Sequence, residues 1–590
     1  MIKEFYYYLV ILFSGLFDRA YYLLTYPDVR KADIDPLLHY VKYGWKENRN
    51  PSKKFNTKFY LNQYPDVKIA NINPLIHYIK FGIKENRHTN FEELTSHNLN
   101  NESKNKIKTF KLNYQNSSQT DKFIINFEDV YNNVNEIPLT DQVDIVICVG
   151  PNTTNVIECL ESIKQNTAFE NYNIHLVIHN EDKEKITQII SPEVFLHTHD
   201  MESFNYSRAN NIVLKSSKND VVLLNDDTVV TNGWLSKLRT ASKGVALTGA
   251  HTSPRCSGNP QMWGEGPISI TKYPINMFCA YIPFRVHQVV GFLDEEFVYY
   301  GGEDVDYSCR TVLNGFPLVI SEAFIFHKDN QSYGEIKEAL MKESDKIIKD
   351  KYNIEAPFDL SEIIPKVSII IATRNRPDLL IKAIQSIKQI NYTNYELIIV
   401  DDCSDPETSE ILLNEQRKFN SLIYMRMPEN IGSSSARRKG IQVSNGQFIF
   451  FSDDDDLVLP NRISSPLSHI LKNPFLDIVY CNYNVMDDMG NITPINCEPF
   501  DRQAYLQLRF NIGLGIIFGR RNVFMDVPFH SRYDLATDYD WVFRILRKNY
   551  TIDLCPEIVM NYNRSGAVVH HLSGTKESIK THNEIYNREL

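Results

Sequence analysis

The sequence predicts an α/β protein in which a small α-helical region is followed by two consecutive units, each a parallel β-sheet covered by helices. Three observations support this prediction. A 38-residue motif recurs near the N-terminus, apolar strand-like runs alternate with amphipathic helices twice further on, and polar residues gather where those runs end. A chain of 590 residues is also too long for one hydrophobic core.

The composition is that of a globular protein, with 43% apolar and 23% charged residues. The net charge of −10 gives no reason to expect a nucleic-acid partner. Nine cysteines, an odd number without metal-type spacing, favour reduced thiols in a cytoplasmic protein. The apolar segment at residues 5–17 is too short to span a bilayer.

The helical region, residues 1–88, contains two copies of the repeated motif. Each copy is expected to form two short helices, with Asp35 or Asn73 as the N-cap before a first-turn proline. His39 and His77 hold corresponding positions, where packing is favoured over metal binding. The region has 14 Lys and Arg against 8 Asp and Glu, or +6. This charge favours peripheral association with an anionic membrane surface, although a solvated charged face is the simpler explanation.

The remainder of the chain is expected to hold four segments. Their predicted bounds are a polar linker over 89–140, the first α/β unit over 141–335, a helical connector over 336–364 and the second α/β unit over 365–590. The strands are predicted at residues 143–149, 174–178 and 221–224 in the first unit, and at 367–372, 396–400 and 448–451 in the second. Ligands of such sheets bind beyond the carboxyl ends of the strands.

The polar run at the end of the last of these strands is Asp453 to Asp456, four consecutive carboxylates that lead straight back into apolar residues. Crowded carboxylates at the end of a buried strand repel one another unless a cation is present. A hard divalent cation that itself holds a diphosphate resolves this repulsion.

The motifs of both units resemble those of family-2 glycosyltransferases, which have the GT-A nucleotide-sugar fold. The second unit contains SIIIATRNRP, IIVDDCSD, NIGSSSARRKGI and FFSDDDDLVLP in the order of that family. The first contains FNYSRANN, LLNDDTVV and GFLDEEFVYYGGEDVDYSCR, which is similar to bacterial O-antigen-type transferases. The resemblance covers about residues 143–330 and 365–572 and implies two tandem GT-A domains.

This resemblance implies a site for Mg²⁺ or Mn²⁺ in each unit. The metal position falls on Asp453 and Asp455 in the second unit, and on Asn225 and Asp227 in the first. Asn225 keeps an oxygen ligand but removes a charge. The alternative interpretation of each run is a solvated turn.

A histidine near the end of such domains completes the metal site. His327 fits this role in the first unit. The corresponding place in the second unit, Asn561 to Ser565, has no histidine, so His570 or His571 is the available substitute, and a surface position is an equal alternative.

The resemblance also implies nucleotide contacts in the second unit. Thr373 would lie beside the nucleotide, Asp402 would bond the base, and Arg437 would steady phosphate oxygens. The alternatives are a helix-capping role for Asp402 and helix-surface charge for Arg437.

A general base is needed to take the acceptor hydroxyl proton in an inverting transfer. By resemblance this base is Asp304 in the first unit and Asp538 in the second. Asp306 and Asp540 follow two residues later and would point elsewhere on a helix. An N-terminal helix cap is the alternative for either base.

These features predict a bifunctional, metal-dependent glycosyltransferase at the inner face of the bacterial plasma membrane. It would transfer sugars from UDP- or dTDP-sugar donors to an oligosaccharide or lipid-linked glycan, and so extend a capsule or O-antigen. One alternative is a single active transferase whose other GT-A domain is an acceptor-binding scaffold. The other is a non-catalytic glycan-binding protein.

Overall fold

The structure is a computed structural model that describes residues 7–8, 10–11, 14, 16–32, 34–52, 55–64, 67, 72–82, 87, 89, 111–114, 123–134, 140–150, 153–167, 170–253, 259–262, 264–298, 301–328, 337–419, 421–487, 489–506, 512–530 and 537–563. Within these ranges no helix is both long and apolar enough to cross a membrane. The chain divides into two compact units, Met1–Thr109 with Pro254–Ser257, and Phe110–Ser253 with Gly258–Leu590.

The N-terminal unit is built from short helices, including α2 Arg19–Thr25, α3 Pro27–Lys31, α4 Pro36–His39, α5 Thr57–Gln63 and α7 Pro74–His77. Both predicted caps are present, because the Asp35 side chain accepts a hydrogen bond from the Leu38 N–H and the Asn73 side chain accepts from two backbone N–H groups. His39 and His77 are buried, and Nδ1 of each lies 3.1 Å from a tyrosine Oη, that of Tyr22 or Tyr60. These contacts support the packing interpretation of both histidines.

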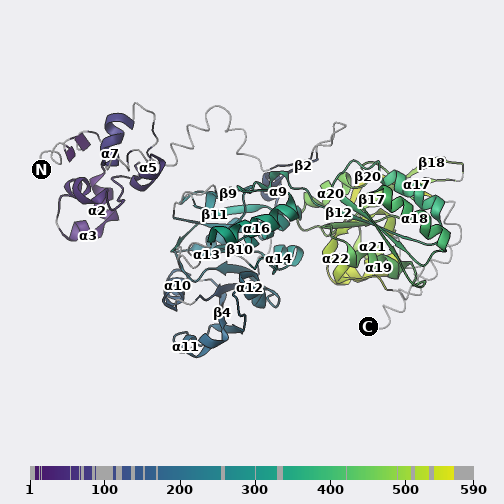
Figure 1. Ribbon diagram of the computed structural model, residues 1–590, viewed down its shortest axis with the longest axis horizontal. Helices are drawn as coiled ribbons and strands as arrows, with labels where there is room; N and C mark the ends of the chain where they lie inside the picture. Colours follow the sequence, from purple (N-terminus) through teal and green to yellow (C-terminus); the bar gives the residue numbers. More distant parts are fainter. Residues whose placement is uncertain are drawn as a thin grey trace. The chain divides into compact units, whose positions relative to one another are not determined.

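The described part of the large unit contains two nine-stranded sheets whose main paths follow the same order of strands. Figure 1 shows strands of both, with β4, β10 and β11 labelled in the first sheet and β12, β17 and β20 in the second. The first runs β5-β4-β3-β6-β10-β8-β11-β7 with β9 on β11, and the second runs β14-β13-β12-β15-β19-β17-β20-β16 with β18 on β17. The strands of the first are β3 Val143–Cys148, β4 Tyr172–His179, β5 Phe195–His199, β6 Asp220–Leu224, β7 Thr228–Val230, β8 Leu247–Thr252, β9 Ser269–Ile270, β10 Cys279–Ile282 and β11 Leu318–His327. Those of the second are β12 Val367–Thr373, β13 Tyr395–Asp401, β14 Leu422–Arg426, β15 Phe448–Phe451, β16 Leu457–Val458, β17 Ile478–Met486, β18 Ile492–Ile495, β19 Ile517–Arg520 and β20 Ile552–Asn563.

We call the part around the first sheet, residues 140–328, the first head, and the part around the second, residues 366–563, the second head. In the first head the main helices are α10 Thr153–Asn166, α12 Tyr206–Leu214, α13 Trp234–Ser242, α14 Phe284–Val290 and α15 Glu303–Leu313. In the second they are α17 Pro377–Ile387, α18 Pro406–Lys418, α19 Ser433–Val443, α20 Ser464–Leu471, α22 Arg521–Asp526 and α23 Thr537–Arg547. Helix α16, Lys337–Tyr352, is the predicted connector helix.

The sheets are mixed, whereas the sequence predicted parallel sheets. Strands β5, β4, β3 and β6 are parallel, as are their counterparts β14, β13, β12 and β15. Strands β10 and β19 run antiparallel to both of their neighbours. Four residues is too short for a periodic signal, and the direction of such a strand is set by long-range pairing.

The predicted polar linker, residues 89–140, contains ordered elements near its end. These are the paired strands β1 Lys111–Tyr114 and β2 Phe123–Asn126, and helix α9 Phe127–Asn133. Helix α9 packs on the first head, since Phe127 is buried and the Tyr131 hydroxyl donates a 2.7 Å hydrogen bond to the Ala241 carbonyl. The apolar spacing of Phe127, Val130 and Tyr131 is the helical signal in this segment.

The two heads share one hydrophobic cluster, which continues from the first head around Phe316 to the second around Phe448. Arg520 is fully buried between these two rings, with its guanidinium 5.4 Å and 5.5 Å from their centroids. Its Nη1 donates a 2.7 Å hydrogen bond to the Asn314 carbonyl of the first head. The heads therefore meet through a packed and hydrogen-bonded interface.

Candidate active site

The aspartate run of the second head follows β15 and is held by side chains from two elements, α19 and β12. Arg437, on α19, donates a 2.6 Å hydrogen bond to Asp453. Thr373, at the end of β12, donates a 2.8 Å hydrogen bond to Asp454, which is buried. The predicted residues therefore come together at the carboxyl end of the parallel strands, where ligands of such sheets bind.

Three of the four carboxylates of the run form ion pairs with two arginines, Arg376 and Arg437, so the negative charge of the run is not fully balanced. Burial, together with the negative charges of Asp453 and Asp454 and against the opposing effect of Arg376, raises the pKa of Asp455 to about 6. Burial also raises the pKa of Asp456 well above its usual range. These carboxylates favour a cation, and Asp453 and Asp455 supply the oxygen ligands that suit Mg²⁺ or Mn²⁺.

The carboxylate of Asp402 accepts hydrogen bonds from the protein backbone. Its two carboxylate oxygens accept hydrogen bonds from the N–H groups of Ile431 (2.6 Å) and Gly432 (3.0 Å), immediately before α19. Gly432 has φ +80°, a conformation that favours glycine. Asp402 therefore fixes the turn that leads into the Arg437 helix, and its predicted contact with the base would use its remaining lone pairs.

In the first head, three predicted metal-site residues come together. His327 Nε2 lies 3.2 Å from the Asp227 carboxylate and 3.5 Å from the Asn225 side-chain amide. The His327 ring stacks on Phe278, with centroids 5.1 Å apart. Asp226 faces the other way and accepts a 2.8 Å hydrogen bond from the Gly150 N–H.

These donor sets fit a metal that the substrate helps to hold. Among the described residues, no three His, Cys, Asp or Glu side chains are arranged to bind a metal ion on their own. Asp227 and His327 in the first head, and Asp453 and Asp455 in the second, leave ligand positions for phosphate oxygens.

Strand register identifies the residue of the second head that replaces His327. Val229 pairs with Phe326 in the first sheet, and its counterpart Leu457 pairs with Asn561 in the second. The residue after Asn561 is Tyr562, which therefore occupies the place of His327. Burial is the main cause that raises the pKa of Tyr562 to about 12, and the negative charges of Asp456, Asp453 and Asp455 contribute to this rise. The predicted substitute His570 lies outside the described residues.

The same comparison of strand register identifies the first-head counterpart of Asp402, the residue predicted to bond the base. Val143 pairs with Tyr172, and Val367 pairs with Tyr395, so the first-head counterpart of Asp402 is His179, at the end of β4. The sequence alone could not align His179 with Asp402, because the two units share no motif around these positions.

The two predicted bases lie at equivalent positions, in the first turns of α15 and α23. Asp304 accepts a 2.8 Å hydrogen bond from the Val305 N–H, and Asp538 accepts one of 2.8 Å from the Tyr539 N–H. Burial raises the pKa of Asp304, which favours the proton-accepting role that the sequence predicted.

Asp306 and Asp540 point away from this position, as predicted. Each is buried and forms an ion pair with an arginine four residues later, Arg310 or Arg544. Asp306 and Asp540 are therefore structural carboxylates, and the predicted bases Asp304 and Asp538 lie two residues before them.

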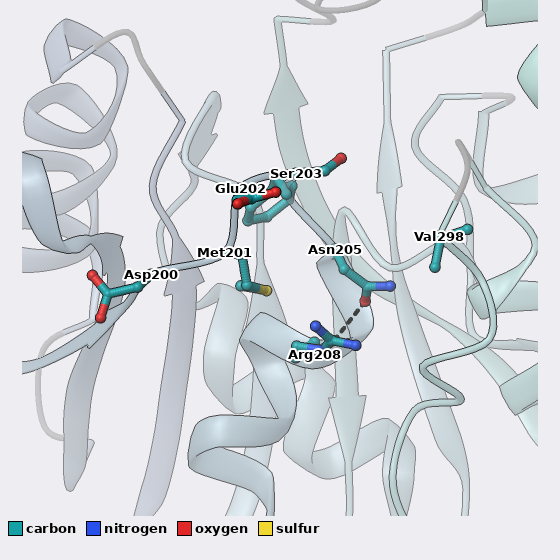
Figure 2. A pocket seen from close by; sticks show the side chains of 8 residues that line it. Asp200, Met201, Glu202, Ser203, Asn205, Arg208 and Val298 are labelled. Carbon is teal, nitrogen blue, oxygen red and sulfur yellow. Dashed lines mark hydrogen bonds between the residues drawn. The ribbon is translucent and has the colours of Figure 1, made fainter.

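A cavity of about 550 Å³ opens beyond the end of β5, at the edge of the first sheet where β6 also ends. Figure 2 shows its lining, with Asn205 and Arg208 at the start of α12. The lining residues are Asp200, Met201, Glu202, Ser203, Phe204, Asn205, Arg208 and Val298. This cavity lies on the ligand-binding edge of the sheet.

Comparison with known proteins gives a family match for the second head. The family described as Glycosyl transferase family 2 matches residues 368–548. Similar proteins include an uncharacterized glycosyltransferase of Methanocaldococcus jannaschii (24% identity over 34% of this chain and 70% of that protein), the putative colanic acid biosynthesis glycosyl transferase WcaA of Escherichia coli (31%, over 31% and 66%), and chondroitin synthase of Pasteurella multocida (28%, over 49% and 33%). The chain thus spans less than two thirds of the last two relatives.

Among solved structures, the mannosyltransferase PcManGT of Pyrobaculum calidifontis, in complex with GDP-Man and Mn²⁺, is 17% identical over 38% of this chain and 65% of its own, with a TM-score of 0.31.

Proposed function

Because the chain contains a family 2 glycosyltransferase domain, we propose that it is a bifunctional glycosyltransferase that extends a bacterial surface polysaccharide. The observation that carries the proposal is the equivalence of the two heads. Each sheet carries an acidic run at the end of its last parallel strand, β6 or β15, and each head has a predicted base in the first turn of a helix, Asp304 in α15 or Asp538 in α23. The donors would be UDP- or dTDP-sugars, and the acceptor an oligosaccharide or a lipid-linked glycan.

In the proposed transfer, Asp304 or Asp538 accepts the proton of the acceptor hydroxyl. The acceptor oxygen bonds to the anomeric carbon as the bond from that carbon to the diphosphate breaks, and the nucleoside diphosphate leaves with inversion. A bound Mg²⁺ or Mn²⁺ would neutralise the charge that develops on this leaving group. Arg437, which contacts Asp453, would bind the phosphate oxygens directly.

The test is to change the two bases separately in the full chain. Asp304→Asn and Asp538→Asn are each assayed with Mn²⁺ and a panel of UDP- and dTDP-sugars, with product analysis by mass spectrometry. We expect each variant to lose a different transfer, by about 100-fold or more. If one variant is silent, the protein has a single active head. If neither variant loses a transfer, the assignment of both bases is wrong.

One observation favours the single-head alternative. Asn225 replaces an acidic residue in the first head, so this head holds one negative charge fewer at the metal position. In that case the first head would bind the acceptor while the second performs the transfer. A non-catalytic glycan-binding protein would show no metal-dependent release of nucleoside diphosphate from any donor.

A further inference from the structure

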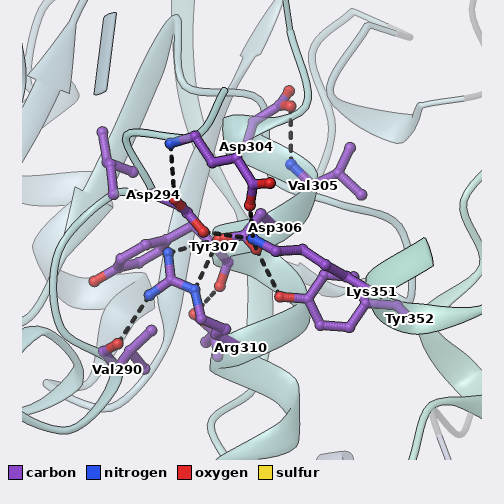
Figure 3. Close-up of polar contacts among 12 residues, drawn as sticks. Val290, Asp294, Asp304, Val305, Asp306, Tyr307, Arg310, Lys351 and Tyr352 are labelled. Atoms are coloured by element: carbon purple, nitrogen blue, oxygen red, sulfur yellow. Dashed lines mark hydrogen bonds and ion pairs between the residues drawn. The ribbon is translucent and has the colours of Figure 1, made fainter. Parts of the chain in front are cut away.

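The connector helix α16 contacts the acidic motif of the first head. Asp306, fully buried two residues after the base candidate Asp304, receives donors from two different elements (Figure 3). Arg310 of the same helix binds Oδ2 through Nε (2.8 Å) and Nη2 (2.7 Å). The connector supplies both contacts to Oδ1, from Tyr352 Oη (2.6 Å) and Lys351 Nζ (3.2 Å).

Half of this arrangement recurs in the second head. Arg544 binds Oδ2 of Asp540 through Nε (2.9 Å) and Nη2 (2.8 Å), and its Nη1 donates to the Pro528 carbonyl (2.8 Å). Arg310 likewise donates through Nη1 to the carbonyl of Val290 at 2.8 Å. The arginine that binds the buried aspartate is therefore common to both heads, whereas the contacts from Lys351 and Tyr352 occur in the first head and come from the connector.

Lys351 links the acidic motif to the loop that borders the cavity of the first head. Its Nζ forms an ion pair with Asp294 and lies 5.0 Å from the centroid of the Phe297 ring. The backbone carbonyl of Phe297 accepts a 3.2 Å hydrogen bond from Asn205, which lines the cavity. One cation thus connects three parts of the proposed site: the α15 helix, this loop and the start of α12.

The start of α15 is also packed against the connector. Gly302 is the N-cap of this helix, with φ +96°. A Cβ at this position would lie 2.7 Å from the Phe297 ring and 3.0 Å from Cβ of Ser344, on α16. The turn that carries Asp304 is therefore confined between the loop and the connector.

We propose that Lys351 and Tyr352 are positioning residues of the first head, which act through Asp306 to hold Asp304 and the cavity-lining loop in place. This inference rests on the proposed function of the first head. It makes the connector, which continues into the second head, part of the first head's site. A shift of the α15 first turn by about 1 Å would misplace the base relative to the acceptor hydroxyl.

The variants to test are Tyr352→Phe, which removes one hydroxyl, and Lys351→Met, which removes one cation. Both are made in full-length protein that carries Asp538→Asn, so that the remaining transfer from the UDP- and dTDP-sugar panel comes from the first head. We expect kcat to fall about tenfold in each, with KM for the donor within about twofold, because the donor contacts are intact and the base is misplaced. Lys351→Arg keeps the charge and is expected to restore at least half of kcat.

The matched control is Lys349→Met, on the same helix. Lys349 is exposed and its ion pair is with Glu355, away from Asp306. This variant is expected to keep wild-type kcat. Thermal unfolding of every variant is recorded, and a kcat loss that follows the melting temperature and is not restored by Lys351→Arg would overturn the proposal in favour of simple destabilisation.

Failure of this inference and of the proposed function are distinguishable. If Asp304→Asn abolishes the first-head transfer while Lys351→Met and Tyr352→Phe leave kcat unchanged, the positioning role is wrong and the proposed function stands. If Asp304→Asn has no effect on that transfer, the base assignment fails, and the positioning role fails with it.

Discussion

The two heads carry different residues at one position of the predicted metal site. His327 of the first head and Tyr562 of the second hold equivalent positions. His327 places a ring nitrogen, Nε2, 3.2 Å from the carboxylate of Asp227. Tyr562 offers a phenol whose pKa is raised, so it stays protonated near neutral pH. A neutral imidazole is a better metal ligand than a phenol, and the predicted metal ligands of the second head, Asp453 and Asp455, are both carboxylates.

We therefore expect Tyr562→His to lower the Mn²⁺ concentration for half-maximal activity of the second head by about threefold to tenfold, because it adds a nitrogen ligand. The reciprocal change, His327→Tyr, is expected to raise that concentration for the first head. The measurement is a Mn²⁺ titration of each half-reaction. Equal titration midpoints before and after both exchanges would show that this position does not face the metal.

Glu303 provides a test of pH dependence. Burial, together with the negative charges of the neighbouring Asp304 and Asp306, raises its pKa to about 8. The folded state therefore binds a proton more tightly than the unfolded state, and its stability falls as the pH rises from about 4.5 to about 8.

Glu303→Gln removes that penalty. We expect the unfolding temperature of this variant, relative to the wild type, to increase as the pH rises from 5 to 8, by an amount that corresponds to more than about 1 kcal/mol. Glu322→Gln, at an exposed position of β11, is the control and is expected to show no such trend. A constant difference across the pH range would contradict the raised pKa.

At the scale of elements, the sequence was informative where a strand or helix follows a local pattern. The apolar runs between predicted helices predicted β3, β4, β6, β12, β13 and β15, and the predicted metal ligands Asp453 and Asp227 follow β15 and β6 in the chain. The reversal of β10 and β19 depends on pairing with distant strands, so no local pattern encodes it. The place of Tyr562 follows only from the register of β16 with β20.

The helical repeats are closely packed at one glycine in each copy. A Cβ on Gly44 would overlap the Oη of Tyr22, and a Cβ on Gly82 would overlap the Oη of Tyr60. These are the hydroxyls that contact the buried histidines His39 and His77. The glycine, the tyrosine and the histidine of each copy therefore form one packed set.

We expect Gly44→Ala to destabilise the first copy by about 1–3 kcal/mol, because the methyl group displaces the Tyr22 hydroxyl. The double variant Gly44→Ala with Tyr22→Phe provides the space and is expected to recover part of this loss. Hydrogen exchange of residues 16–50, measured by mass spectrometry, reports on both. If the single variant exchanges like the wild type, the close packing is not present.

At the scale of the whole molecule, the two heads of the large unit behave as one packed body. Arg520 crosses from the second head to the Asn314 carbonyl, and the shared cluster contains residues of both sheets. Arg285 of the first head reaches the second and binds the buried Asp477 (2.8 Å) and the Pro474 carbonyl. Such an interface fixes the orientation of the two proposed sites, so both would be presented to the same acceptor in one geometry.

This interface makes a specific prediction for unfolding. Asp477 accepts hydrogen bonds from Thr551 through Oδ2, whereas Arg285 is its cationic partner at Oδ1. Arg285→Ala leaves this buried carboxylate without its cation, and we expect a loss of roughly 2–3 kcal/mol at the interface. Calorimetry of the full chain should then show the shared transition of the two heads separate into two, while Arg285→Ala combined with Asp477→Asn restores part of the coupling because the stranded charge is gone. If the calorimetric profile of Arg285→Ala is unchanged, the ion pair between Arg285 and Asp477 does not couple the unfolding of the two heads.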